Sequence, residues 1–200
     1  MKTLVIATAN AGKLREIRAM LAPLGCEVVT QTALGIAEAE EPHLTFIENA
    51  LAKARHVAAL ARLPALADDS GVCAVALGGE PGVHSARYGG NGTSREERDA
   101  RNNQKLVAAL ADCADRRAYY YCAMVLVRHA ADPQPLIGEG YWWGEISMQA
   151  RGANGFGYDP HFVLPELGKT AAELDPEYKN RISHRGQALA QLVAKLRVFP

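Results

Sequence analysis

The sequence predicts an α/β domain whose segments form two lobes around a shared sheet. Short apolar runs rich in β-branched residues alternate with segments in which apolar residues recur every three or four positions. The chain has 200 residues, 48% of them hydrophobic, which is enough for a substantial core. No repeat, low-complexity tract or linker interrupts the sequence. We therefore expect a single domain over residues 1–200.

The first half of the chain predicts alternating strands and helices. Residues 2–7 form an apolar strand run, a helix then ends near Pro23 and Gly25, and residues 27–31 predict a second strand. A helical pattern beginning at Leu44 follows, with Asn49 and Lys53 away from its apolar face. Residues 64–67 predict a strand that ends at an acidic turn, and residues 72–77 predict a separate strand.

The second half opens with a glycine-rich stretch over residues 78–93. Ser94 and Glu97 form a capping box for a helix that reaches about Leu110. Residues 119–127 and 136–146 predict a long hairpin, and residues 152–160 predict a glycine-rich loop. A second capping box at residues 170–173 predicts a brief helix, and the apolar residues of 189–196 have helical spacing.

The composition of the chain argues against several classes of protein. Lys and Arg total 22, as do Asp and Glu, so no excess positive charge favours binding to a nucleic acid. The apolar stretch at residues 3–9 is too short to span a membrane or to serve as a signal peptide. The four cysteines form no C-x-x-C pair, which favours reduced, buried thiols. We therefore expect a cytoplasmic protein, with a small anionic ligand still possible.

Residues 8–13 place a strand end next to a helix start, where free backbone amides can face an anion. The segment is not a P-loop, because Ala7 stands where that motif needs glycine and Leu14 where it needs Ser or Thr. An ordinary turn with a solvated Lys13 fits the same residues. By itself this segment does not identify a site.

The dipeptide Asp68-Asp69, followed by Ser70, is the second candidate. Adjacent carboxylates are costly to bury without a cation, and Mg²⁺ takes one or two carboxylates together with phosphate oxygens. Glu40 and Glu41 can join them if the fold brings them together. An exposed acidic turn is the alternative for both dipeptides.

Two later segments suit ligand binding, one through stacking of a base and one through contact with an anion or a carbonyl-rich group. In residues 155–159 the glycines permit close backbone approach, and the Phe156 ring offers a face on which a base can stack. Residues 179–186 bring Lys179, His184 and Arg185 to the start of the last helix, where positive charge is disfavoured unless an anion or carbonyl-rich ligand is present. A tight turn with a buried Phe and an exposed His-Arg pair are the alternatives.

Across nearly its whole length the chain resembles the inosine triphosphate pyrophosphatase family. The matching strings are residues 8–16 (T-x-N-x-x-K-x-x-E), 45–53 (TFIENA with Lys53), 67–71 (ADDSG), 85–88 (SARY), 155–160 (GFGYDP) and 183–186 (SHRG). Each string alone can arise by chance, but six in register are highly specific.

The resemblance implies an elongated mixed central β-sheet flanked by helices, two lobes with an active-site cleft between them, and a homodimer. It implies Mg²⁺-dependent hydrolysis of ITP, dITP, XTP and dXTP to the monophosphate and pyrophosphate, which cleanses the nucleotide pool. By position, Asp69 is the catalytic base, and Glu41, Asp69 and Asp68 are the metal ligands. The implied substrate-binding residues are Thr8, Asn10, Lys13, Lys53, Ser70, Phe156, Gly157, Tyr158, Asp159, Lys179, His184 and Arg185.

The chemistry of these residues agrees with the resemblance. Lys13 and Lys53 can neutralise a polyphosphate, while His184 and Arg185 can donate to the 6-carbonyl of hypoxanthine or xanthine, where adenine presents a donor. Two other functions use the same pockets: a nucleotide sensor without turnover, and a Mg²⁺-dependent phosphomonoesterase. The Asp68-Asp69 pair favours the pyrophosphatase, and no D-x-D nucleophile motif supports the phosphomonoesterase.

Overall fold

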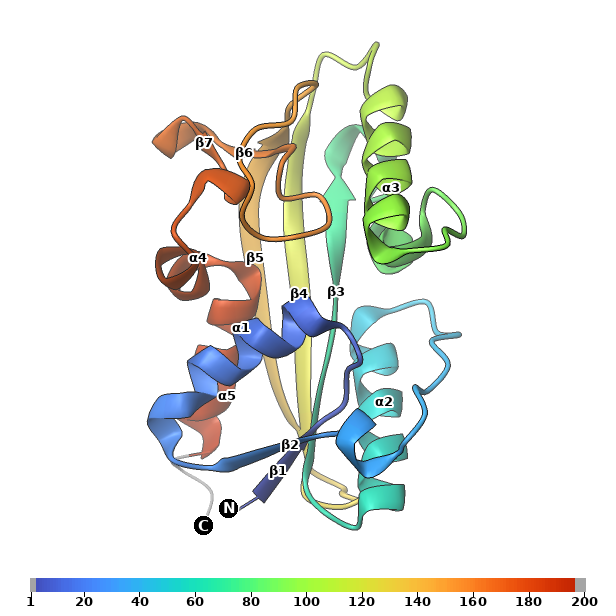
Figure 1. Ribbon diagram of the computed structural model, residues 1–200, viewed down its shortest axis with the longest axis vertical. Coiled ribbons are helices and arrows are strands. Elements are labelled where there is room, and N and C mark those ends of the chain that lie inside the picture. Colours follow the sequence, from blue (N-terminus) through green and yellow to red (C-terminus); the bar gives the residue numbers. More distant parts are fainter. Residues whose placement is uncertain (1–2, 197–200) are drawn as a thin grey trace. The chain divides into compact units, whose positions relative to one another are not determined.

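The computed structural model describes residues 3–196, which divide into two compact units (Figure 1). Unit 1 comprises residues 3–69, 122–140 and 184–196, and unit 2 comprises residues 70–121 and 141–183. Two units agree with the two lobes expected from the sequence, while the cleft between the lobes stays a prediction. Lys2, in the first predicted strand, lies outside the described residues.

Seven strands and five α-helices are assigned among the described residues. In chain order they are β1 (Thr3–Ile6), α1 (Ala11–Leu21), β2 (Glu27–Thr30), α2 (Phe46–Ala61), β3 (Ala65–Ala74), α3 (Arg95–Ala109), β4 (Arg117–Val127), β5 (Leu136–Ile146), β6 (Phe162–Leu164), β7 (Lys169–Thr170), α4 (Pro176–Ile182) and α5 (His184–Leu196).

The strands hydrogen-bond in the order β2-β1-β3-β4-β5-β6-β7. Strand β1 pairs in parallel with both β2 and β3, whereas β6 pairs antiparallel with β5 and with β7. The sheet is therefore mixed, as the sequence resemblance implied. The last residue of β1, Ile6, pairs with Leu66 near the start of β3, so the turn after β1 lies beside the middle of β3.

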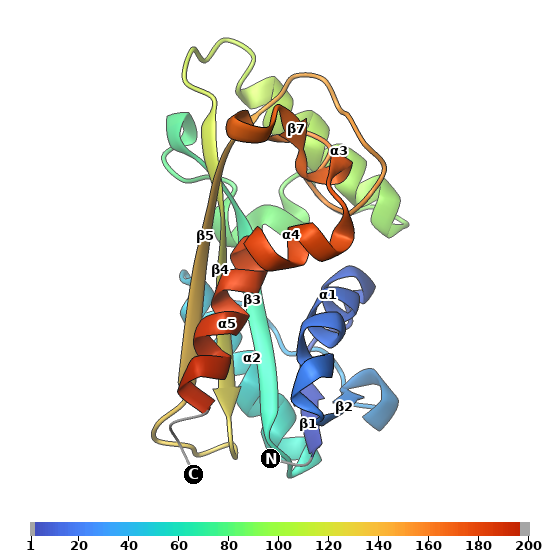
Figure 2. The same cartoon turned by 90° about the vertical axis from the view of Figure 1, so that its left-hand side faces the viewer.

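Unit 1 packs helices on both faces of its strands. Apolar residues of α1 and α5, such as Ile17 and Leu189, join Leu4 and Ile6 of β1 in one buried cluster. Helix α2 covers the opposite face with a row of small residues that includes Ala54 (Figures 1 and 2). Small side chains let the helix backbone approach the sheet closely, which brings the polar side chains of its first turns near β3.

Unit 2 has its own core. Leu106 of α3 and its C-cap Leu110 pack with Phe162 of β6 and Trp142 of β5. Trp142 is 6% exposed, whereas the neighbouring Trp143 is 56% exposed. Trp142 is therefore a core residue and Trp143 is not, because successive side chains on a strand point to opposite faces.

Two sequence expectations about β3 and α2 are wrong. Residues 65–74 form one strand, so Asp68 and Asp69 lie in its middle and not in a turn at its end. Lysine and arginine side chains neutralise the two carboxylates, and the polar residues therefore do not end the strand. Leu44 is 87% exposed and precedes the helix, which begins after the N-cap Thr45.

The predicted brief helix after the second capping box is one 3-10 turn, Ala171–Glu173, with the box itself present. The sequence analysis missed α4, whose start is marked by the N-cap Asp175 and by Pro176 at its first position. It also missed strands β6 and β7, which have only three and two residues. Elements this short carry no periodicity from which to predict them.

Candidate active site

The turn between β1 and α1 is built by side chains that bond its own backbone. Asn10 is the N-cap of α1, and its Oδ1 accepts from the Lys13 amide at 3.0 Å. Thr8 Oγ1 accepts from the Asn10 amide at 3.1 Å. The Ala9 amide donates to a carboxylate oxygen of Glu38 at 3.1 Å. An anionic oxygen thus already bonds this turn, in agreement with the expected preference for anions at the start of a helix.

Asp68 is the centre of a buried ionic group in unit 1. Its carboxylate, 0% exposed, lies 3.1 Å from Lys13 Nζ and accepts from the Arg185 guanidinium at 3.2 Å. Arg185, whose side chain is 2% exposed, also pairs with Glu16 of α1. Two cations and two carboxylates therefore balance one another in the interior of unit 1.

Asp69 lies in a second group on the other side of β3. Its Oδ1 is 3.4 Å from Lys53 Nζ, and the same ammonium donates to Glu41 at 2.6 Å. Its Oδ2 accepts from the side-chain amide of Asn49 at 3.2 Å. We call residues 38–43, which include Glu41, the acidic loop. Lys53 and Asn49 come from successive turns of α2, so one helix face holds the Asp69 carboxylate and the acidic loop together.

The two adjacent aspartates have different protonation behaviour. Burial acts to raise the pKa of Asp68, but the charges of Lys13 and Arg185 outweigh it and hold that pKa well below its usual range. Burial raises the pKa of Asp69, and Lys53 and Lys13 offset only part of this effect. Asp68 is therefore a permanent anion, whereas Asp69 is the more basic carboxylate and suits proton transfer.

The carboxylates of Glu41, in the loop before α2, and Asp69, on β3, fit a hard divalent cation that also binds a substrate. Glu41 and Asp69 both reach the Lys53 ammonium, so two carboxylates already converge on one positive charge. Among residues 3–196, no group of three or more His, Cys, Asp or Glu side chains is placed to hold a metal ion. Mg²⁺ commonly uses only one or two carboxylates and takes its other ligands from phosphates and water.

In unit 2, residues 155–159 form a loop that we call the base loop. Its glycines Gly155 and Gly157 have φ angles of 77° and 63°, which side-chain-bearing residues rarely adopt. Asp159 closes the loop by accepting from the Phe156 amide at 2.9 Å and from Lys179 Nζ at 2.6 Å. The loop conformation is thus fixed by a buried charge pair.

Two cations lie near the ring of Phe156. Lys179 Nζ is 5.2 Å from its ring centroid, and the Arg95 guanidinium of α3 is 4.7 Å away. Asp159 also accepts from the Tyr120 hydroxyl at 3.1 Å. The unit therefore combines an aromatic face with a fixed ammonium donor, which suits a planar ligand that carries a carbonyl oxygen.

The remaining predicted site residues take other places. Tyr158 is buried, and its hydroxyl donates to the Ser85 carbonyl at 2.7 Å, so its side chain belongs to the core. Ser70 follows Asp69 along β3. His184 is 4% exposed at the first position of α5. The Gly157 amide donates to Asp99 of α3, and its carbonyl accepts from Asn103.

Several contributors were not predicted as site residues. Glu16 stands in the first matching string without an assigned role, and its partner Arg185 is 169 positions away. Arg95, Asp99 and Asn103 lie on a helix whose polar face indicates only exposure to solvent. The sequence placed Asn49 with Lys53 away from the apolar face of the helix, and in the structure both side chains contact Asp69.

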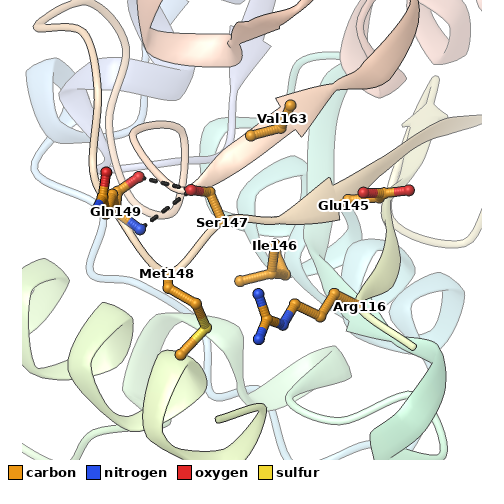
Figure 3. Close-up of a pocket in the computed structure, with 7 residues that line it drawn as sticks. All are labelled: Arg116, Glu145, Ile146, Ser147, Met148, Gln149 and Val163. Atoms are coloured by element: carbon orange, nitrogen blue, oxygen red, sulfur yellow. Dashed lines mark hydrogen bonds between the residues drawn. The ribbon is translucent and has the colours of Figure 1, made fainter. Parts of the chain in front are cut away.

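A separate pocket of about 380 Å³ lies at the end of β5 in unit 2 (Figure 3). Ser147 there bonds the backbone of Gln149, while Arg116 and Met148 line the wall. The residues described around this pocket include none of the predicted site residues.

Within residues 3–196, no helix has both the length and the apolar character that a membrane crossing requires.

Comparison with known proteins covers the whole chain. The Ham1 family model matches residues 4–195. A protein of Nitrosomonas europaea named dITP/XTP pyrophosphatase is 65% identical over 196 residues, which cover 98% of this chain and 95% of that protein. A protein of Ralstonia nicotianae with the same name is 62% identical over 199 residues, covering 100% of this chain and 98% of its own.

Solved structures of related proteins have the same fold as this chain. The structure of a HAM1 protein from Coxiella burnetii has a TM-score of 0.89 and 48% identity, covering 98% of this chain and 99% of that chain. The Staphylococcus aureus Ham1 protein has a TM-score of 0.85 and 37% identity over the full length of both chains. The predicted fold class, an α/β fold with a mixed sheet, is confirmed.

Proposed function

This chain belongs to the Ham1 family, and from that premise we propose that it hydrolyses ITP, dITP, XTP and dXTP to the monophosphate and pyrophosphate. The family match confirms the resemblance found in the sequence motifs. In this role the enzyme removes purine nucleotides that would otherwise be incorporated into DNA and RNA. Both compact units together form the proposed single domain over residues 1–200.

The observation that carries the proposal is the pair of charge groups on strand β3. Lys13 and Lys53 each pair with one of the two adjacent aspartates, so two ammonium groups are held at one strand segment. The turn before Lys13 offers further amide donors to an anion. A bound triphosphate needs several fixed positive groups of this kind. Negative charge builds up on the oxygens of the departing pyrophosphate during hydrolysis, and these groups stabilise it.

We assign Mg²⁺ to Glu41 and Asp69, the carboxylates that share Lys53. When bound, the ion neutralises charge on phosphate oxygens. Asp68 was also predicted as a metal ligand. Its contacts with Lys13 and Arg185 favour a different role, in which it fixes the position of the Lys13 ammonium.

In the proposed reaction, a water molecule attacks the α-phosphorus and its oxygen forms the new bond. The bond from that phosphorus to the bridging oxygen breaks, and pyrophosphate leaves with the bonding electrons. Asp69 orients the water and accepts its proton, for which a raised pKa is suitable. Lys13 and Lys53 stabilise the charge that develops on the phosphate oxygens.

Base recognition is assigned to unit 2. The base stacks on Phe156, and Lys179, oriented by Asp159, donates to the 6-carbonyl of hypoxanthine or xanthine. Adenine presents an amino donor at that position, which would leave a buried ammonium facing another donor. Such a mismatch is worth about 10⁴-fold or more in discrimination where the site is fully desolvated.

Arg185 was predicted to contact the base. The structure places its guanidinium against Glu16 and Asp68, at 2% exposure, so we assign it instead to holding Asp68.

The homodimer and the cytoplasmic location also remain proposals. The four cysteines are free, which fits a reducing compartment.

The test is steady-state kinetics with Mg²⁺ and ITP, XTP, GTP or ATP, following pyrophosphate release. We expect kcat/KM for ITP and XTP to exceed that for ATP by about 10⁴-fold, the scale of a polar mismatch in a desolvated site. Lys179→Met should reduce this ratio, whereas Lys169→Met, at an exposed lysine of β7, should leave it unchanged. Binding of ITP without turnover would indicate the sensor, and release of orthophosphate would indicate the phosphomonoesterase.

A further inference from the structure

We propose that Asn49 is a positioning residue that fixes the acidic loop and the Asp69 carboxylate relative to one another. This inference rests on the proposed function, since it gives Asn49 a part in the geometry of the metal and water sites. The observation is a single amide side chain that bonds two distant segments of unit 1. Those segments carry the two carboxylates assigned to Mg²⁺.

The amide of Asn49 is 0% exposed, and each of its polar hydrogens and its oxygen has a partner. Its Oδ1 accepts from the His43 backbone amide at 3.0 Å. Its Nδ2 donates to the His43 carbonyl at 3.2 Å and to Asp69 Oδ2 at 3.2 Å. His43 is two residues after Glu41, so the bonds to its backbone hold the end of the acidic loop.

This pattern permits only one orientation of the amide. Turning it by 180° would place Oδ1 against the His43 carbonyl and the Asp69 carboxylate, three acceptors with no hydrogen between them. A fixed amide in turn orients Asp69, because one carboxylate oxygen is bonded to Asn49 and the other faces Lys53 at 3.4 Å. The direction of the Asp69 lone pairs is therefore set from α2.

Asn49 and Lys53 have complementary tasks. Lys53 bonds the Glu41 carboxylate itself, whereas Asn49 bonds the backbone two residues later, and both reach Asp69. An ammonium can be displaced from carboxylates when a divalent cation takes its place. The neutral bonds of Asn49 do not compete with that cation, so they keep the loop and the strand in register when the charges rearrange.

The chain offers a matched control. Asn102 is also a helical asparagine, is 2% exposed, and also holds a loop, since its Oδ1 accepts from the Gly89 amide at 2.6 Å. Its bond reaches a backbone amide and no carboxylate. Asn49→Asp and Asn102→Asp both preserve volume and bury a new carboxyl group, but only Asn49→Asp removes a donor from Asp69.

The experiment measures three quantities for the wild type, Asn49→Asp, Asn49→Ala and Asn102→Asp. These are the melting temperature, the Kd for Mn²⁺ from the electron paramagnetic resonance of the free ion, and kcat and KM for ITP. Both Asn49 variants should lower kcat by about 10-fold or more, which is the effect expected when the hydrogen-bond partner of a metal ligand is lost. The KM for ITP should change by less than about 3-fold. Their Kd for Mn²⁺ should change by at least 3-fold. Asn102→Asp should lower only the melting temperature.

The inference is overturned if the Asn49 variants lose thermal stability while kcat and the Kd for Mn²⁺ stay within 2-fold of the wild type. If Asn49→Ala does not fold, Asn49→Asp and Asn49→Ser, which keeps one donor, decide the question by the same criteria. A wild type that does not hydrolyse ITP would refute the proposed function instead. The Mn²⁺ measurement would then still decide whether Asn49 shapes the cation site.

Discussion

Replacing Arg185 by methionine tests the buried ionic group of unit 1 most severely. The guanidinium is 2% exposed and pairs with both Glu16 and Asp68. Methionine fills much of the volume but removes the guanidinium from both carboxylates, while Lys13 stays 3.1 Å from Asp68. Removing one partner of a buried charge pair costs about 3–5 kcal/mol, so we expect Arg185→Met to lower the free energy of unfolding by that amount.

The assay is urea denaturation followed by tryptophan fluorescence and circular dichroism. Arg15→Met, at an exposed arginine of the same helix as Glu16, is the control and should stay within about 0.5 kcal/mol of the wild type. Adding Glu16→Gln to Arg185→Met should recover about 1–3 kcal/mol, because it removes one of the two carboxylates that lost the guanidinium. An Arg185→Met protein as stable as the wild type would refute the account of this group.

The same variant separates two roles for Arg185 in catalysis. If Arg185 holds Asp68, the variant loses kcat but keeps the preference for ITP over ATP. If the guanidinium recognises the base, as the sequence resemblance implied, that preference collapses. Measuring kcat/KM for ITP, ATP and GTP under conditions where the variant is folded distinguishes these outcomes.

Three further predictions follow from other contacts. Asp69→Asn should lower kcat for ITP by roughly 10²–10⁴-fold, the scale for a positioned acid or base; normal turnover by a folded variant would exclude its role as base. Asp159→Asn removes the charge partner of Lys179 at 2.6 Å and should reduce the ITP-to-ATP ratio of kcat/KM by at least about 10-fold; an unchanged ratio would remove the base loop from recognition. Hydrogen bonds from Arg128 hold the pKa of Asp132 well below 3.8, so its stabilisation is present above that pH and is lost as pH falls below it. Asp132→Asn should therefore cost about 1.5–3 kcal/mol at pH 7, and the difference from the wild type should shrink in acid; a constant difference in urea titrations at pH 7 and pH 3 would contradict this.

Local chemistry was readable from the sequence where neighbouring residues determine it. The predicted cap Ser94 bonds the Glu97 amide three residues later, and α3 begins directly after it. The long hairpin of β4 and β5 follows from its aromatic and β-branched residues and its turn. These features need no knowledge of the rest of the fold.

Partnerships across the chain were not readable. Arg185 pairs with Asp68 at a separation of 117 residues, and no spacing rule links the two positions. The same pairing explains why β3 continues through two aspartates that seemed to end it. Sequence motifs named both Arg185 and Asp68 as site residues, but only the structure shows that the guanidinium is bonded to Asp68 and Glu16.

The most direct test of the central claim is hydrolysis of ITP in ¹⁸O-labelled water with Mg²⁺, followed by ³¹P nuclear magnetic resonance and mass spectrometry. Attack at the α-phosphorus predicts inosine monophosphate carrying one ¹⁸O and pyrophosphate carrying none, in equal amounts. Label in the pyrophosphate, or release of orthophosphate in its place, would contradict the proposed reaction.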